Sequence, residues 1–305
     1  RAQSINGVRL YEERWRYYPS DSLAAHALGF VGFEEDELRG RYGVEQYYND
    51  VLKREKKDIY VNFFAEIFAN IEHSLFYDDD FSREGDLVLT IEPEVSRFLS
   101  NTLDTALKKW NTNEGGGIIV NPLTGAIYAM EARPTFDPNV FEENKDYAVF
   151  SNPFAESVFE FGSILKPLTV AFGLDTGAIT GKSAYYDEGV ITVGDAKISN
   201  YDGKARGFIP IQEVLNQSLN VGAVYIMQKT GKDTFARYIS EFGLGEETGI
   251  DLPNEVPGLI GNLGTGRDIE FATAAFGQGV ALTPIATVRA LSALANGGML
   301  VTPHV

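Results

Sequence analysis

The sequence contains no cysteine, only three histidines and no long hydrophobic run. Without cysteine there is no disulfide framework, no thiolate nucleophile and no cysteine-based zinc site. The histidines are scattered along the chain at His26, His73 and His304, so a Ser-His-Asp arrangement is not indicated. No stretch approaches the roughly 18 consecutive apolar residues of a membrane-spanning helix. Any nucleophilic serine in this chain is therefore expected to use a base other than histidine.

Basic residues are also scarce. The 26 Lys and Arg against 43 Asp and Glu give a formal net charge of -17. Nucleic-acid binding depends on clustered Lys and Arg that neutralise phosphates, so a nucleic-acid partner is excluded. No Gly-x-Gly-x-x-Gly segment or other phosphate-binding loop follows a strand-like stretch. We expect neither a nucleotide cofactor nor a resident metal.

What remains is a globular chain with two regimes. Its 305 residues are 44% hydrophobic and 12% aromatic, enough for one large core or two smaller ones. Residues 1–84 are charged and aromatic, with short helices expected at 22–28 and after Tyr42, and with 59–73 undecided between helix and strand. This part is predicted to be a small interaction module. Residues 85–305 are predicted to form the second domain.

The second regime has an α/β layout of the α+β type. Residues 86–91 are expected to form a strand, and 94–110 an amphipathic helix. Residues 117–120 and 126–130 flank Asn121-Pro122-Leu123-Thr124-Gly125, whose Pro and Gly positions are typical of a β-hairpin. The order of strand, helix and hairpin favours an antiparallel sheet flanked by helices over a doubly wound fold.

The strongest chemical signal is Ser163-Ile164-Leu165-Lys166, followed by Pro167. Proline is tolerated only in the first turn of a helix, so Pro167 places the helix start close to Ser163. Residues three apart share one face of a helix. The Lys166 amine is therefore expected to lie beside the Ser163 hydroxyl, as a base beside a nucleophile. The same spacing also occurs by chance in many proteins.

A second candidate pair is Ser218 and Asn220. In an extended or turn segment, side chains two residues apart point to the same side, so a hydroxyl and an amide could face one pocket. Taken alone, the segment is better interpreted as a polar helix end.

Ser-x-x-Lys followed by Ser-x-Asn is the motif order of penicillin-binding proteins and class A β-lactamases. The chain resembles a class B penicillin-binding protein, a monofunctional peptidoglycan D,D-transpeptidase. The matching segments, in the family's order, are Arg16-Tyr17-Tyr18-Pro19 with residues 23–29, Tyr42-Gly43-Val44-Glu45, residues 87–91, residues 121–125, residues 134–139, residues 161–167, residues 218–222, residues 242–245 with 248–253, and Phe276-Gly277-Gln278-Gly279 before Thr283-Pro284.

The resemblance implies a penicillin-binding transpeptidase fold, with residues 1–84 as part of an N-terminal pedestal module and 85–305 as the transpeptidase domain. The family's third motif, Lys-Thr-Gly, lies on a strand well beyond the Phe-Gly-Gln-Gly segment. Lys229-Thr230-Gly231 spells it, but this triplet directly follows a stretch expected to be helical, and we interpret it as a helix end. The genuine third motif and the last strands of the sheet are expected beyond Val305, so the domain is expected to lack its C-terminal part.

The resemblance also implies roles for four residues. Lys166 would deprotonate Ser163, which would form an acyl-enzyme with the stem peptide of peptidoglycan. Ser218 would relay a proton to the leaving D-alanine, and Asn220 would hold Lys166 and the substrate. Two positions depart from the family's usual pattern: Phe161 stands where proline is usual, and the bulky Leu219 separates Ser218 from Asn220.

The implied partners are peptidoglycan stem peptides, β-lactam antibiotics, a membrane glycan polymerase and other cell-wall synthesis proteins. The implied location is the extracytoplasmic face of the bacterial membrane, with an N-terminal transmembrane anchor outside this chain. Two alternatives stay open: a penicillin-binding sensor or non-catalytic scaffold of a cell-wall synthesis complex, and a serine β-lactamase.

Overall fold

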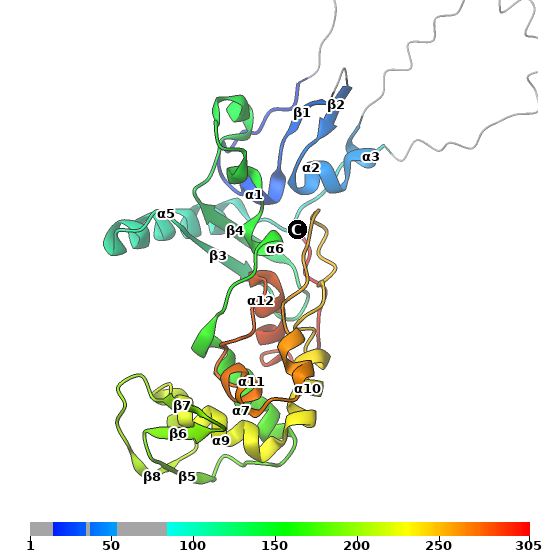
Figure 1. Cartoon of the computed structure of the whole chain (residues 1–305). Helices are drawn as coiled ribbons and strands as arrows, with labels where there is room; N and C mark the ends of the chain where they lie inside the picture. Colours follow the sequence, from blue (N-terminus) through cyan, green and yellow to red (C-terminus); the bar gives the residue numbers. More distant parts are fainter. Residues whose placement is uncertain (1–14, 35–36, 54–83) are drawn as a thin grey trace, which may run out of the picture.

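The computed structural model describes residues 15–34, 37–53 and 84–305. Figure 1 shows the N-terminal part at the top, a hairpin and the long helix α5 in the middle, and a helical part below with small strands at its edge. The undecided segment 59–73 lies outside the described residues.

The N-terminal part consists of short helices around one hairpin. Its elements are α1 (Ala25–Leu28), β1 (Val31–Glu34), β2 (Glu37–Gly40), α2 (Gly43–Tyr47) and α3 (Asn49–Leu52). The helix expected at 22–28 is present only over its second half, as α1, and follows a turn at 21–24. Gly29 ends it with a φ of 72°, a conformation that favours glycine. The helix expected after Tyr42 is confirmed as α2.

The middle of the molecule is a hairpin covered by α5. Its elements are α5 (Pro93–Trp110), β3 (Gly115–Val120) and β4 (Ile127–Arg133). The two strands pair antiparallel, with Ile118 opposite Met130. Glycines in β3 let the helix approach closely, because a Cβ on Gly117 would lie 2.9 Å from Leu99 of α5. The helix and the hairpin predicted from the sequence are therefore both confirmed.

The strand predicted at 86–91 is wrong. The segment has no strand assignment, although its side chains alternate in exposure, with Val88 96% exposed. It is attached instead through the Thr90 hydroxyl, which donates to the carbonyl of Ile127 at 2.8 Å and to that of His304 at 3.1 Å. Alternation shows which side chains face the protein, and it does not by itself show that the backbone pairs.

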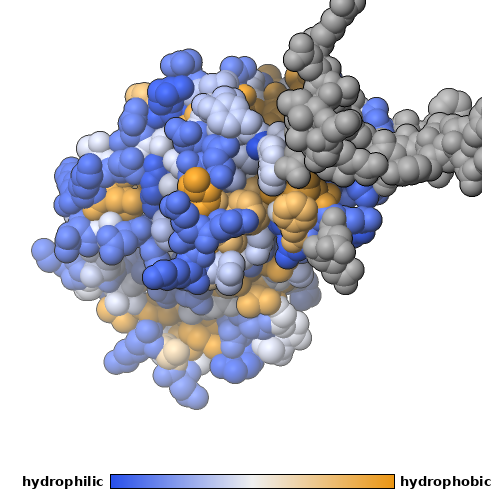
Figure 2. Space-filling model, turned by 90° about the horizontal axis from the view of Figure 1, so that it is seen from above, coloured by the Kyte–Doolittle hydropathy of each residue, from blue (hydrophilic) through white to orange (hydrophobic). Residues whose placement is uncertain are grey.

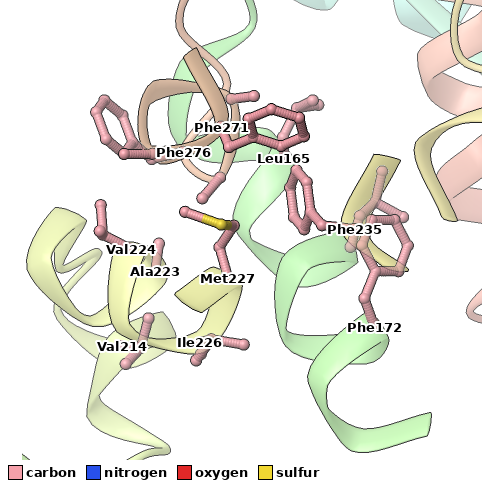
Figure 3. Packing of buried hydrophobic residues seen from close by; sticks show 14 of the residues in the cluster. Leu165, Phe172, Val214, Ala223, Val224, Ile226, Met227, Phe235, Phe271 and Phe276 are labelled. Carbon is pink, nitrogen blue, oxygen red and sulfur yellow. The ribbon is translucent and has the colours of Figure 1, made fainter. Parts of the chain in front are cut away.

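The lower part is mainly helical and holds the largest core. The connecting elements are η1 (Pro138–Glu143), η2 (Tyr147–Phe150), α6 (Pro153–Glu156), η3 (Gly162–Leu165), α7 (Lys166–Asp175), β5 (Ala184–Asp187), β6 (Val190–Val193), β7 (Ala196–Ser199), β8 (Gly207–Pro210), α8 (Glu213–Asn216), α9 (Asn220–Thr230), α10 (Lys232–Glu241), η4 (Gly261–Thr265), α11 (Asp268–Ala274) and α12 (Pro284–Ala293). β5 pairs with β8 and β6 with β7, each antiparallel. Figure 3 shows Phe172 of α7, Met227 of α9 and Phe271 of α11 meeting in this core.

Two smaller cores join the N-terminal part to the rest. One combines Ala27 and Val44 with Ile127 and Met130 of β4. The other is aromatic, and in it Phe30 stacks on Phe141 with ring centroids 4.1 Å apart. The N-terminal part therefore shares its buried surface with the following residues. The domain boundary at 84/85 stays a prediction.

Seen from above, the molecule is largely hydrophilic, with separate apolar patches (Figure 2). Among the residues that the structure describes, no helix combines the length and apolarity needed to span a membrane.

Candidate active site

Ser163 lies in the 3-10 turn η3, directly before α7. Pro167 is in the first turn of α7, where its missing N–H costs no helical hydrogen bond. The predicted helix start is thus confirmed to within one turn. Ser163 itself is exposed, whereas the nearby Leu165 is buried in the large core. The turn is therefore anchored in this core by Leu165 and presents the Ser163 hydroxyl to solvent.

The Phe-Gly-Gln-Gly segment supports this turn from behind. Gly162 N–H donates to the Gly277 carbonyl at 3.0 Å, and Gly279 N–H donates to Glu160 Oε1 at 3.0 Å. Gly277 has a φ of 78°, and a Cβ there would lie only 2.1 Å from the Gly162 carbonyl oxygen. A structural role for this motif was not predicted from the sequence. Its signal was the repeated glycine, which marks a close approach of two backbones.

Ser218 reaches the same place from the α8–α9 connection. Its φ of 53° is left-handed, which is uncommon for a residue with a side chain. Leu219, the next residue, is fully buried in the large core. The leucine that stands between Ser218 and Asn220 therefore anchors the turn and does not line the pocket.

Lys166 connects the two serines. Its Nζ lies 3.1 Å from Ser163 Oγ, 3.0 Å from Ser218 Oγ and 2.6 Å from the Ser218 carbonyl oxygen. The side chain is almost completely buried, at 1% exposure. Burial disfavours the charged ammonium and lowers the pKa of Lys166 to about 8. About a tenth of the Lys166 amine is then neutral at pH 7, and only this neutral form can act as a base.

Asn220 lies at the first position of α9, beside this cluster. Its Nδ2 donates to the carbonyl of Ser199 at 3.0 Å. The bond to Lys166 expected from the resemblance is not among the hydrogen bonds of residues 84–305. Asn220 is thus tied to the end of β7, while Ser163, Lys166 and Ser218 form one hydrogen-bonded cluster.

Lys229-Thr230-Gly231 lies at the junction of two helices, as interpreted from the sequence. α9 ends at Thr230, and Gly231 precedes α10. Lys229 is exposed, and its Nζ lies over the ring of Tyr225, 5.5 Å from the centroid. The triplet does not join the serine and lysine cluster.

Phe161 borders the site on the other side. Its ring lies 6.1 Å from that of Phe159, and both residues line a cavity of about 550 Å³ that extends to Gly115 and Gly116 of β3. An aromatic ring, where the family usually has proline, thus lines this cavity two residues before Ser163.

Comparison with known proteins gives the family. Residues 115–305, more than half of the chain, match the penicillin binding protein transpeptidase domain. The chain belongs to the penicillin-binding transpeptidase family. The resemblance drawn from the motifs and the predicted fold class are both confirmed.

Similar proteins include Stage V sporulation protein D of Bacillus subtilis (strain 168), 34% identical over 100% of this chain and 47% of its own length. A peptidoglycan D,D-transpeptidase FtsI homolog of Mesostigma viride is 30% identical over 100% of this chain and 52% of its own length. A crystal structure of penicillin binding protein 3 from Mycobacterium tuberculosis with aztreonam has a TM-score of 0.77 and 23% identity, covering 94% of this chain and 60% of that one.

This penicillin-binding transpeptidase chain spans about half the length of the curated relatives that it matches. The family match covers the hairpin β3–β4 and every element from η1 to α12. It therefore includes all four candidate residues.

Proposed function

We propose that this protein is a peptidoglycan D,D-transpeptidase that cross-links stem peptides through an acyl-enzyme at Ser163. The observation that carries the proposal is the position of the buried Lys166 amine, within hydrogen-bonding distance of both serine hydroxyls. A relative named as a peptidoglycan D,D-transpeptidase supports the choice of substrate.

In the first half of the reaction, neutral Lys166 takes the proton from Ser163 Oγ as this oxygen attacks the carbonyl carbon between the last two D-alanines. The negative charge on the carbonyl oxygen is stabilised by the Ser163 backbone N–H at the start of the helical segment. The peptide C–N bond then breaks. The proton passes from Lys166 through Ser218 Oγ to the nitrogen of D-alanine, which leaves as a free amine.

In the second half, the amine of a neighbouring stem peptide attacks the ester carbon. Its proton returns along the same route, Ser163 regains its hydroxyl, and a new peptide bond joins the two stems. Asn220, fixed at the start of α9, would hold the substrate backbone alongside the cluster. Penicillins would acylate Ser163 through the same first half, with the lactam C–N bond breaking. This chemistry would take place at the extracytoplasmic face of the membrane, where stem peptides are found.

The experiment is labelling of the full-length protein with a fluorescent penicillin. Wild type and Ser240→Ala, an exposed serine on α10, are expected to label, whereas Ser163→Ala is not. Cross-linking of stem peptides by the wild type would then separate a transpeptidase from a sensor or scaffold. Rapid release of hydrolysed penicillin would instead indicate a β-lactamase, and absence of labelling in the wild type would overturn the proposal.

A further inference from the structure

A buried carboxylate and amide pair lies beside the Ser218 turn. Asp187, the last residue of β5, is 0% exposed, and Asn200, directly after β7, is 2% exposed. Asn200 Nδ2 donates to both carboxylate oxygens of Asp187, at 3.1 and 2.9 Å. Gly189 N–H donates to the same carboxylate at 2.9 Å. Because a buried carboxylate is costly without donors, these bonds hold the pair in one geometry.

Asn200 also links this pair to the start of α9. Asn200 Oδ1 accepts from the N–H of Val221, the second residue of that helix, at 3.2 Å. Leu219, at the N-cap position, offers no capping side chain, so the first N–H groups of α9 need partners from elsewhere. Asn200 supplies one from a different segment. The carboxylate behind it polarises the amide and suits the positive end of the helix.

Further bonds tie the same segment to both sides of Ser218. Before Ser218, the side chain of Gln217 accepts through Oε1 from Arg206 Nε at 3.1 Å. The backbone N–H of Arg206 donates to the backbone carbonyl of Asp187 at 3.1 Å. After Ser218, Asn220 donates to the Ser199 carbonyl. Figure 1 shows the strands β5 to β8 gathered next to α9. The Ser218 turn is thus held from residue 217 to residue 221 by one neighbouring lobe.

Ser218 needs such support. Its left-handed backbone is strained in residues other than glycine and persists only when the surroundings enforce it. Its Oγ and carbonyl oxygen are both partners of the Lys166 amine. Displacing this turn would therefore change the position and solvation of Lys166.

We propose that Asp187 and Asn200 are positioning residues of the active site, which fix the Ser218 turn on Lys166 through the start of α9. This inference rests on the proposed acylation of Ser163. Neither residue is expected to touch the substrate.

The test is a swap of the pair in the full-length protein. Asn200→Asp removes the donor and places two carboxylates together. Acylation by fluorescent penicillin at pH 8 is expected to fall between about tenfold and about 100-fold, the range that misplacement of catalytic groups produces. The double variant Asp187→Asn with Asn200→Asp restores a donor and an acceptor in exchanged positions. It is expected to recover acylation to within about threefold of wild type, as coupled partners do in a double-mutant cycle.

The pH profile distinguishes positioning from loss of fold. If the turn moves in Asn200→Asp, Lys166 gains solvent, and the rise of the acylation rate with pH shifts to higher pH than in the wild type. Asn139→Asp is the matched control, because Asn139 Nδ2 also donates to an aspartate, Asp137, at 3.0 Å, next to Tyr18 of the N-terminal part. It is expected to lower the melting temperature and leave the acylation profile unchanged.

The inference is overturned if the wild type is acylated and Asn200→Asp keeps its rate and profile, or if the swap recovers nothing. Should Asn200→Asp fail to fold, Asp187→Asn tests the same pair, because it removes the negative charge and one of the two oxygens that accept from Asn200 Nδ2. Its acylation is expected to fall about threefold to tenfold, about 0.7 to 1.4 kcal/mol by the tenfold-per-1.4 kcal/mol relation. An unchanged rate in that variant would contradict the inference. Absence of acylation in the wild type would instead refute the proposed function.

Discussion

At the scale of single residues, the site depends on one amine. Lys166 is buried, and yet its Nζ contacts two hydroxyls and a carbonyl oxygen. The pair of Ser163 and Lys166 could be predicted from the sequence, because residues three apart on a helical turn are neighbours whatever surrounds them. The third partner, Ser218, was expected only from the resemblance to the family's motif order. Its left-handed backbone could not be predicted, because it depends on contacts with the neighbouring lobe and no local pattern encodes it.

The pH dependence of acylation follows from this burial. Only the neutral amine accepts the serine proton, and the pKa of Lys166 is lowered from 10.5 to about 8. The rate of acylation is therefore expected to rise as pH increases through about 8 and then to level off. The check is the second-order rate constant for fluorescent penicillin between pH 6 and about 10, a span that brackets the lowered pKa and stays below the ordinary lysine value. A flat profile would contradict the assignment of Lys166 as base.

Replacing each of two lysines in turn distinguishes the Ser-x-x-Lys motif at Lys166, which is proposed to be catalytic, from the Lys-Thr-Gly triplet at Lys229, which is not. Lys166→Arg keeps the charge but loses the base, and acylation is expected to fall by about 100-fold or more, as for other general bases. Lys229→Arg, in the exposed Lys-Thr-Gly triplet, is expected to have no effect. Equal losses in both variants would place the third motif at Lys229 after all.

At the scale of elements, the turn that carries Ser163 is held by a second turn from far along the chain. Helix α5 and the hairpin were predictable, since each is encoded by a local period. The support of η3 by Gly277 was not, because two backbones meet there across more than 100 residues and only the glycines mark the contact. The strand predicted at 86–91 was wrong for a related reason. Alternation is a local pattern, whereas strand pairing depends on a backbone partner from elsewhere in the chain.

Gly277→Ala tests this contact. The added Cβ would lie 2.1 Å from the Gly162 carbonyl oxygen and would force the Ser163 turn to move. Acylation is expected to fall by about tenfold or more, with a loss of stability of about 1–3 kcal/mol, as in overpacked sites.

The control is Gly177→Ala, where φ is also positive, at 71°, and nothing lies within 4 Å of the added carbon. It carries the backbone strain without the collision, so a modest drop in melting temperature and an unchanged acylation rate are expected. If the two variants behaved alike, the contact with Gly162 would not position Ser163.

At the scale of the whole molecule, the N-terminal part is joined to the hairpin by shared cores and by a buried carboxyl. Glu131 of β4 is 2% exposed and accepts from the Ala24 N–H at 3.0 Å, with Arg133 Nη1 at 3.9 Å. Burial raises the pKa of Glu131 from 4.5 to about 7. A division into two parts was predicted from composition. Their common buried surface was not, because it forms between residues about 100 positions apart.

This carboxyl makes stability fall as pH rises. Below pH 4.5 Glu131 is protonated in both states, whereas between 4.5 and about 7 only the unfolded chain ionises, which favours unfolding. Glu131→Gln keeps an acceptor for Ala24 and cannot ionise. It is expected to match the wild type near pH 4.5 and to exceed it by up to about 3 kcal/mol above pH 7.

Thermal or urea unfolding across this pH range is the measurement, with exposed Glu143→Gln as the control. A difference between Glu131→Gln and wild type that did not grow with pH would show that the carboxyl ionises as easily in the folded protein as in the unfolded chain.

The hydroxyl of Thr90 has a consequence for the order of assembly. Its bond to the Ile127 carbonyl spans 37 residues, and its bond to the His304 carbonyl spans 214. During synthesis, the first partner emerges from the ribosome soon after Thr90, whereas the second emerges only 214 residues after it. A chain that folds as it is synthesised therefore fastens the 86–91 segment in two separate events. The time between them is set by the speed of translation, not by the strength of either bond.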